Sequence, residues 1–225
     1  MVKILGKELI LRVADQCAKV FTKRNVYIAT DDKRINDLCK KHNFKTIITP
    51  KNCKTGTDRI FFAAKEIGKS DFFINVQGDE PLVSALDIKK IIKAKKKFMN
   101  HVICGYSRVN FKTANNLNIP KVVINKESNL LYMSRSLIPG SKKMHFKNQL
   151  SYLKQVCIYA YTFSELKEFN KFSGKSYNEN LEDIEILRFL DLNRPIKMVE
   201  VSDGSVAVDV KKDIKKVIRI LKKDG

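Results

Sequence analysis

The chain has 225 residues, of which 44% are apolar, enough to bury a sizeable core and typical of a soluble globular protein. No apolar run approaches the roughly 18 residues that a membrane-spanning helix needs. Polar residues interrupt the first dozen positions, so we expect no signal peptide and a cytoplasmic protein.

The net charge is +20, from 44 basic and 24 acidic residues. Such an excess suggests a basic RNA-binding protein, because basic side chains neutralise phosphates and release counterions. The basic residues are mainly Lys, however, and aromatic residues are not interleaved with them as stacking platforms would require. The densest runs, Lys89–Lys97 and Lys211–Lys223, have amphipathic helical patterns. We therefore interpret them as solvated helix faces and keep RNA binding only as an alternative of a different class.

The five cysteines are scattered and show no C-x-x-C or C-x-x-H spacing. This pattern predicts neither a zinc site nor a redox pair. We expect free buried thiols, as in a reducing compartment.

Strand-like and helix-like patterns alternate over the first half of the chain. Asp31 and Asp32 follow the first predicted strand and can cap the next helix. Strands that alternate with helices of ten or more residues imply crossover connections, so we predict an α/β fold with a Rossmann-like, mostly parallel sheet flanked by helices. The predicted strands are 25–30, 44–49, 72–76 and 101–106, and the helices are 8–21, 33–42, 57–67 and 85–98.

The alternation stops at residue 108. The patterns then predict strands at 121–125, 130–136, 153–163 and 196–201, and helices at 164–169, 179–192 and 213–222. We therefore predict a single domain over residues 1–225, with a β-rich insertion, a small subdomain, at about 108–163.

The turn after the predicted strand 72–76 is a candidate ligand site, because ligands of open α/β sheets bind beyond the carboxyl ends of the strands. Gly78 lets the backbone approach a ligand closely, and Asp79 offers the hard oxygen that Mg²⁺ prefers beside nucleotide phosphates. An ordinary strand-to-helix turn is the alternative interpretation. A further acid, Asp209, follows a short apolar run; it would share the metal if the sheet brings the strand ends together, and otherwise caps the last helix.

A second candidate turn, residues 55–59, has the sequence Thr-Gly-Thr-Asp-Arg and enters a predicted helix. Free amides, hydroxyls and one guanidinium there can hold an anion or a base edge. Thr or Asp before a helix is also commonly a simple cap, and the sequence alone leaves both interpretations open.

Six segments, taken in order, resemble the 3-deoxy-manno-octulosonate (KDO) cytidylyltransferases, also called CMP-KDO synthetases. The resemblance covers nearly the whole chain, and the string NVQGDEP is its most specific marker. The segments are TGTDR at 55–59, NVQGDEP at 75–81, KVV at 121–123, LYMSRSLIP at 131–139, IYAY at 158–161, and VD at 208–209 followed by DI at 213–214.

The resemblance implies a nucleotide-diphospho-sugar transferase fold and a Mg²⁺-dependent reaction in lipopolysaccharide biosynthesis. The anomeric hydroxyl of an acidic eight-carbon sugar attacks the α-phosphate of CTP, and pyrophosphate leaves. It also implies a homodimer. By matching position, the metal ligands and catalytic residues would be Asp79 and Asp209; the nucleotide-binding residues would be Thr55, Gly56, Thr57 and Arg59; and the sugar-binding residues would be Gln77, Arg135, Gln155, Tyr159 and Glu185.

Two positions depart from the family pattern on the sugar side. Gln155 stands where the family typically has His, four residues before Tyr159, and Ile186 stands where Gln is usual after Glu185. These changes remove a titratable group and an amide, and sites that hydrogen-bond a hydroxyl discriminate strongly between analogues. We therefore keep a modified sugar, such as 8-amino-KDO, as an alternative substrate.

A third departure lies at the N-terminus. The family opens with a strand and a basic, glycine-containing loop whose Arg and Lys bind the triphosphate, and Met1 aligns just after this loop. We therefore expect the chain as written to lack the family's first strand and loop. A nucleotide-binding relative that binds CTP without turnover is the alternative that this implies.

Overall fold

A computed structural model describes residues 2–142, 151–172, 174–202, 206–208 and 210–222. The chain forms two compact units. Unit 1 comprises Met1–Gly68, Val76–Lys89 and Gly204–Gly225, and unit 2 comprises Lys69–Asn75 and Lys90–Asp203. The prediction of a single domain with an insertion at 108–163 stays a prediction.

Unit 1 begins with a hairpin that the sequence patterns did not predict. Strands β1 (Lys3–Ile4) and β2 (Lys7–Glu8) are antiparallel and joined through Leu5 and Gly6, which have φ values of 46° and 75°. Two consecutive positive φ values are typical of the tight turns that match strand twist. Helix α1 (Leu9–Ala18) follows directly, and the chain's last helix, α9 (Lys211–Leu221), contacts β1.

The core of unit 1 lies between α1 and a parallel strand pair. Strands β3 (Tyr27–Thr30) and β4 (Lys45–Ile48) pair in parallel and are connected through α2 (Lys33–Lys41); a short 3₁₀ helix, η1 (Lys23–Asn25), precedes β3. The predicted cap of α2 is confirmed, since the Asp32 side chain accepts from the Arg34 amide at 2.8 Å. The buried residues of this core are Leu11, Ala14, Val26, Ile28, Cys39 and Phe44.

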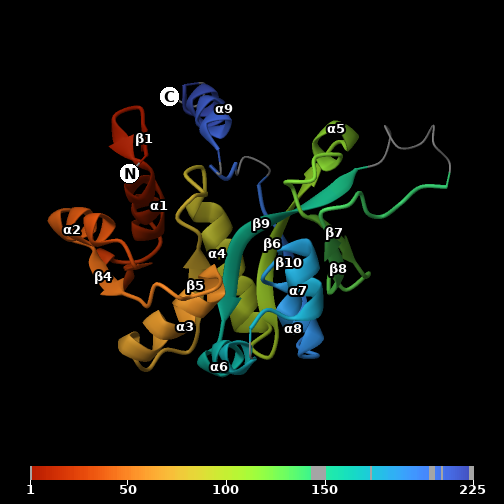
Figure 1. Cartoon of the computed structure of the whole chain (residues 1–225), viewed down its shortest axis with the longest axis horizontal. Coiled ribbons are helices and arrows are strands. Elements are labelled where there is room, and N and C mark those ends of the chain that lie inside the picture. The colour runs from red at the N-terminus through yellow and green to blue at the C-terminus, as the bar shows by residue number, and fades with distance from the viewer. Residues whose placement is uncertain (1, 143–150, 173, 203–205, 209, 223–225) are drawn as a thin grey trace. The chain divides into compact units, whose positions relative to one another are not determined.

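Unit 2 is built on a mixed six-stranded sheet with the order β10-β6-β9-β7-β8, in which β5 also pairs with β9. Strands β10 and β6 are parallel, whereas β6–β9, β9–β7 and β7–β8 are antiparallel. The α/β class is thus confirmed. Strands β8 and β9 run opposite to β6, β7 and β10, which makes the sheet mixed (Figure 1). The strands are β5 (Phe73–Val76), β6 (Val102–Val109), β7 (Lys121–Ile124), β8 (Leu130–Ser134), β9 (Tyr152–Tyr161) and β10 (Ile196–Glu200).

The helices differ from the prediction mainly at residues 179–192, which we predicted as one helix. The structure has two helices there, α7 (Tyr177–Glu182) and α8 (Leu187–Asp191). Asp183 ends α7 in the left-handed region at φ 50°, a conformation that stops helix propagation. The remaining helices are α3 (Gly56–Ile67), α4 (Ala85–Lys97), α5 (Phe111–Ala114) and α6 (Phe163–Lys171).

The prediction of solvated lysines along α4 is wrong for one residue. Lys95 is fully buried, and its ammonium donates to the Glu165 carboxylate at 2.7 and 2.9 Å and to two main-chain carbonyls. A buried charge needs such partners, because desolvation otherwise makes it costly. Desolvation by burial lowers the pKa of Lys95 from 10.5.

All five cysteines are free thiols, as predicted. Cys39 and Cys104 are buried and the other three are half-buried. Over the described part of the chain, no helix is both long enough and apolar enough to span a lipid bilayer.

Candidate active site

The predicted nucleotide-binding turn in unit 1 lies at the N-terminus of α3. Thr55 is the N-cap, and its hydroxyl accepts from the Asp58 amide at 3.2 Å and donates to an Asp58 carboxylate oxygen at 2.9 Å. Gly56 is exposed, whereas Thr57 is fully buried in unit 1. The interpretation of Thr55 as a helix cap is therefore confirmed, and a role in binding cytidine stays a prediction.

Arg59 links the carboxyl ends of two parallel strands. Its guanidinium donates to the hydroxyl of Thr49, which follows β4, and lies 3.4 Å from a carboxylate oxygen of Asp31, which follows β3. Its side chain is 22% exposed, so part of the cation remains accessible to an anion. Arg59 was predicted from the sequence, but its two partners were not. The available signal was their position at the carboxyl ends of predicted strands, since Thr49 ends the strand 44–49 and Asp31 follows the strand 25–30.

Gln77 and Asp79 lie in the turn after β5 and belong to unit 1. The Glu80 amide donates to the Gln77 carbonyl at 3.3 Å, which closes the turn, and both Gln77 and Asp79 are half-buried. Close approach of a ligand to the backbone, the predicted reason for glycine at position 78, is not the only one. A Cβ atom there would lie 3.0 Å from Cδ1 of Ile10 on α1, so close packing also favours glycine at this position.

The segment that leads to Asp209 is hydrogen-bonded to this turn. The amide of Val208 donates to the main-chain carbonyl of Asp79 at 2.9 Å. Asp209 itself lies outside the described residues. The main chain of Asp79 is thus hydrogen-bonded to Val208, the residue before Asp209.

The donors present here fit Mg²⁺ in their chemistry, because Mg²⁺ is usually bound by one or two carboxylates together with substrate phosphates. Asp79 is a half-buried carboxylate of this kind at a strand end. Among the described residues, no group of three or more His, Cys, Asp or Glu side chains could hold a metal by itself. The residues suit a metal shared with a nucleotide better than a closed protein cage.

Three of the four predicted sugar-side residues of unit 2 lie near one another around β9. The Gln155 side-chain amide donates to the Tyr159 hydroxyl at 3.0 Å and to the Cys104 sulfur at 4.0 Å. Burial raises the pKa of Tyr159 well above 10, and the Cys157 thiol and the Glu185 carboxylate add to the effect. Glu185 also raises the pKa of Cys104, after burial as the main cause. Gln155, Tyr159 and Glu185 therefore form one cluster, and the sequence missed Cys104 as its fourth member.

Arg135 makes its contacts outside this cluster. Its Nε donates to the Glu182 carbonyl at 2.5 Å and one terminal nitrogen donates to the Asp183 carbonyl at 2.9 Å. Its main-chain amide donates to the Glu182 carboxylate at 2.8 Å. The guanidinium thus holds the turn between α7 and α8, and its predicted contact with a sugar carboxylate stays a prediction.

A column of aromatic rings supports the sugar-side cluster. Tyr159 stacks on Tyr161 at 5.9 Å between ring centroids, Tyr161 stacks on Phe189 of α8 at 5.5 Å, and Phe189 lies 4.9 Å from Phe169 of α6. The guanidinium of Arg188 caps the column 3.7 Å from the Phe169 centroid. Because stacked and cation–π contacts fix ring orientation, the column ties Tyr159 to α8.

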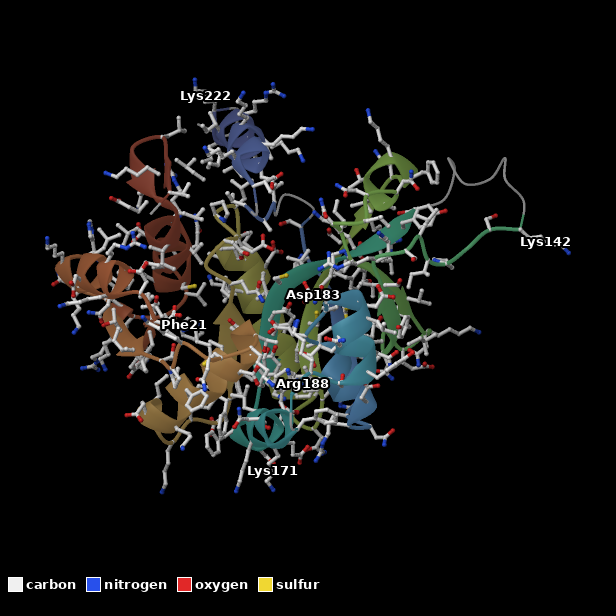
Figure 2. All side chains as sticks on the ribbon, viewed as in Figure 1. Phe21, Lys142, Lys171, Asp183, Arg188 and Lys222 are labelled. Atoms are coloured by element: carbon white, nitrogen blue, oxygen red, sulfur yellow. The ribbon has the colours of Figure 1, made fainter. Side chains whose placement is uncertain are left out.

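Arg188 is itself held by a buried carboxylate. It donates to both oxygens of Glu179 at 2.6 and 2.7 Å, and both side chains are almost fully buried. Arg188 lies on α8, and Asp183 lies in the turn before it (Figure 2). Glu185 lies between these two positions in the chain, so the pair anchors the segment that carries it.

Comparison with known proteins identifies the family of this chain. The family model described as "Cytidylyltransferase" matches residues 1–198. The 3-deoxy-manno-octulosonate cytidylyltransferase of Chloroherpeton thalassium is 34% identical over 99% of this chain and 91% of its own length. The chain belongs to the 3-deoxy-manno-octulosonate cytidylyltransferase family. The protein of that name from Wolinella succinogenes is 31% identical over 97% of this chain and 91% of its own length.

Solved structures agree with this assignment. A structure of CMP:2-keto-3-deoxy-manno-octonic acid synthetase complexed with CTP has a TM-score of 0.89 and 28% identity, and the match covers 100% of this chain and 91% of that one. The inositol-1-phosphate CTP transferase from T. maritima, with 17% identity, a TM-score of 0.67 and 99% and 85% coverage, shares the fold alone.

Proposed function

We propose that the protein transfers CMP from CTP to 3-deoxy-manno-octulosonate, giving CMP-KDO and pyrophosphate for lipopolysaccharide biosynthesis. The proposal rests on one observation above all: family similarity extends over 99% of the chain. The substrates are CTP and an acidic eight-carbon sugar, and the proposed setting is a cytoplasmic homodimer.

In unit 1, Thr55, Gly56, Thr57 and Arg59 would bind the nucleotide. Arg59 is preorganised for this role because Thr49 and Asp31 hold its guanidinium, which reduces the entropy lost when an anion binds. Asp79 and Asp209 would hold Mg²⁺, which would neutralise phosphate charge when bound. Nucleotidyl transfer depends chiefly on positioning and charge neutralisation, so the proposed reaction needs no covalent intermediate with the protein.

In unit 2, Gln155, Tyr159 and Glu185 would orient the sugar through its hydroxyls. Gln77, which belongs to unit 1, is proposed as a sugar-binding residue from its matching position in the family. Arg135 would contribute positive charge toward the sugar carboxylate while it holds the turn before Glu185. The departures at Gln155 and Ile186 favour a second candidate substrate, 8-amino-KDO.

The test is pyrophosphate release by the full chain with CTP, Mg²⁺ and either KDO or 8-amino-KDO. We expect Asp79→Asn to lower kcat/KM about 100-fold or more, because a bound metal contributes several kcal/mol to the transition state. Asp71→Asn, at an exposed position in unit 2, is the matched control and should leave the rate unchanged. CTP binding without pyrophosphate release from either sugar would favour the non-catalytic alternative, and a strongly salt-dependent RNA shift would favour the RNA-binding alternative.

A further inference from the structure

The contact between Gln155 and Tyr159 depends on an irregularity of β9. Residues four apart in a regular strand are separated by about 13 Å, too far for a hydrogen bond. On the neighbouring strand β6, however, Tyr106 faces Gln155 and Cys104 faces Tyr159, so their partners are only two residues apart. The register shift leaves Cys157 and Ile158 unpaired with β6. This bulge brings Gln155 and Tyr159 to 3.0 Å.

The hydrogen bonds of this cluster have a defined direction. The Cys104 thiol donates to the Gly105 carbonyl at 3.5 Å, so its sulfur is left to accept. The Gln155 side-chain nitrogen faces both that sulfur and the Tyr159 oxygen. Because an amide nitrogen can only donate, the Tyr159 oxygen must accept, and its own proton remains for another acceptor.

The surroundings make this direction matter. Tyr159 is 1% exposed and Gln155 is 9% exposed, so water does not readily replace a missing partner. Within the described residues, the Tyr159 hydroxyl takes part in the one hydrogen bond from Gln155. A buried donor that lacks an acceptor is costly, and this cost is relieved when an oxygen atom binds there.

We infer that Gln155 is a positioning residue that holds the Tyr159 hydroxyl as a hydrogen-bond donor toward an oxygen of the bound sugar, with Cys104 fixing the orientation of the amide. This inference rests on the proposed function, since it assumes that the sugar binds at this cluster. An amide presents the same donor at every pH, whereas the imidazole of the His that the family typically has changes from two donors to one donor and one acceptor when it loses a proton. The subsite therefore takes an oxygen that can accept a hydrogen bond, such as a sugar hydroxyl.

The ionisable groups that face Tyr159 are Cys104 on β6, Cys157 and Tyr161 on β9, and Glu185 before α8. Burial raises the pKa of Cys104 and of Tyr159, so both stay protonated near neutral pH. Glu185 is half-buried and is the carboxylate of this set. A pH effect introduced at position 155 can thus be read against a background in which Cys104 and Tyr159 keep their protons.

The experiment compares two nearly isosteric variants, Gln155→Met and Gln155→Glu, by KDO binding calorimetry and by KM for KDO and for CTP. Loss of the donor in Gln155→Met should raise the Kd and KM for KDO roughly fivefold while the KM for CTP stays unchanged. In Gln155→Glu, the introduced carboxyl donates when protonated and accepts when ionised. Its KM for KDO relative to wild type should therefore rise with pH between about 5.5 and 8.5, because burial moves a carboxyl pKa upward.

The matched controls are Gln16→Met and Gln16→Glu on α1, which should leave both KM values unchanged. If Gln155→Met does not fold, Cys104→Ala tests the same set of hydrogen bonds. It removes the sulfur that orients the Gln155 amide, so the amide is free to turn, and the KM for KDO alone should rise. Equal changes for KDO and CTP, or a pH-independent Gln155→Glu, would overturn the inference. Absence of KDO binding by the wild type would instead overturn the proposed function.

Discussion

The buried pair of Glu179 and Arg188 gives the sharpest stability prediction. Replacing Glu179 by Met removes the two hydrogen bonds from Arg188, of 2.6 and 2.7 Å, and one from the Ser176 amide, of 2.9 Å. It leaves a guanidinium that is 1% exposed without its carboxylate. A buried charge without its partner costs about 3–5 kcal/mol. At about 2–4 °C per kcal/mol for a chain of this size, the melting temperature should fall by roughly 6–20 °C.

The assay is denaturant unfolding followed by circular dichroism, with the m-value checked because the chain has two compact units. The double variant Glu179→Met/Arg188→Met removes both charges and should be more stable than Glu179→Met alone. Glu168→Met is the matched control. Its ion pair with Arg194 is 31% and 41% exposed, so it should cost less than about 1 kcal/mol. Equal losses for Glu179→Met and Glu168→Met would refute the reasoning.

Three further predictions concern single positions in unit 2. Gly105→Ala should cost about 1–3 kcal/mol in unfolding free energy, because the added Cβ would lie 3.1 Å from the Val156 carbonyl, whereas Gly140→Ala, with open space around it, should cost much less. Lys121→Met should lower the melting temperature by several degrees, because the buried ammonium donates to three main-chain carbonyls that would lose their partner. Burial is the main cause that lowers the pKa of His101 below 6.5 in the folded protein. Between this lowered pKa and 6.5, the unfolded chain therefore binds a proton at His101 more readily than the folded protein does. The free energy of unfolding should therefore fall as the pH drops through this range, and His101→Gln should flatten that slope in pH-dependent denaturation.

Each of these has a contrary result. Equal stability of the two glycine variants would show that the strand adapts to the extra methyl group. A thermally unchanged Lys121→Met would show that water satisfies the carbonyls. An unaltered pH slope in His101→Gln would assign the slope to other groups.

Much of the fold could be predicted, because in the first half of the chain the spacing of apolar residues matches the faces that the structure buries. Strands β3 and β4 and the cap at Asp32 follow from local patterns that tertiary contacts reinforce. The break at Asp183 could not be predicted, because neither Gly nor Pro marks it and apolar spacing continues across it. The buried Lys95 and Lys121 were also missed. A helical or strand pattern does not reveal carboxylate or carbonyl partners from distant parts of the chain.

The candidate site divides in the same way. Strand-end positions pointed to Arg59 and Asp79 without a structure. The pairing of Gln155 with Tyr159 could not be derived, because regular strand geometry places residues four apart out of reach and nothing in the sequence signals the bulge. The contact of Cys104 with Gln155 could not be predicted for the same reason, because it depends on Cys104 lying opposite that bulge.

The interleaving of the two units has a consequence for synthesis on the ribosome. Unit 1 starts at Met1 but ends with the stretch from Gly204, whose helix α9 contacts β1. Translation from Gly68 to that helix takes roughly 7–30 s at about 5–20 residues per second. During this interval all residues of unit 2 are translated, whereas the first 68 residues still lack helix α9. The nascent chain should therefore complete unit 2 first, and a stop codon that removes α9 should trap an otherwise translated protein with its earliest segment unfinished.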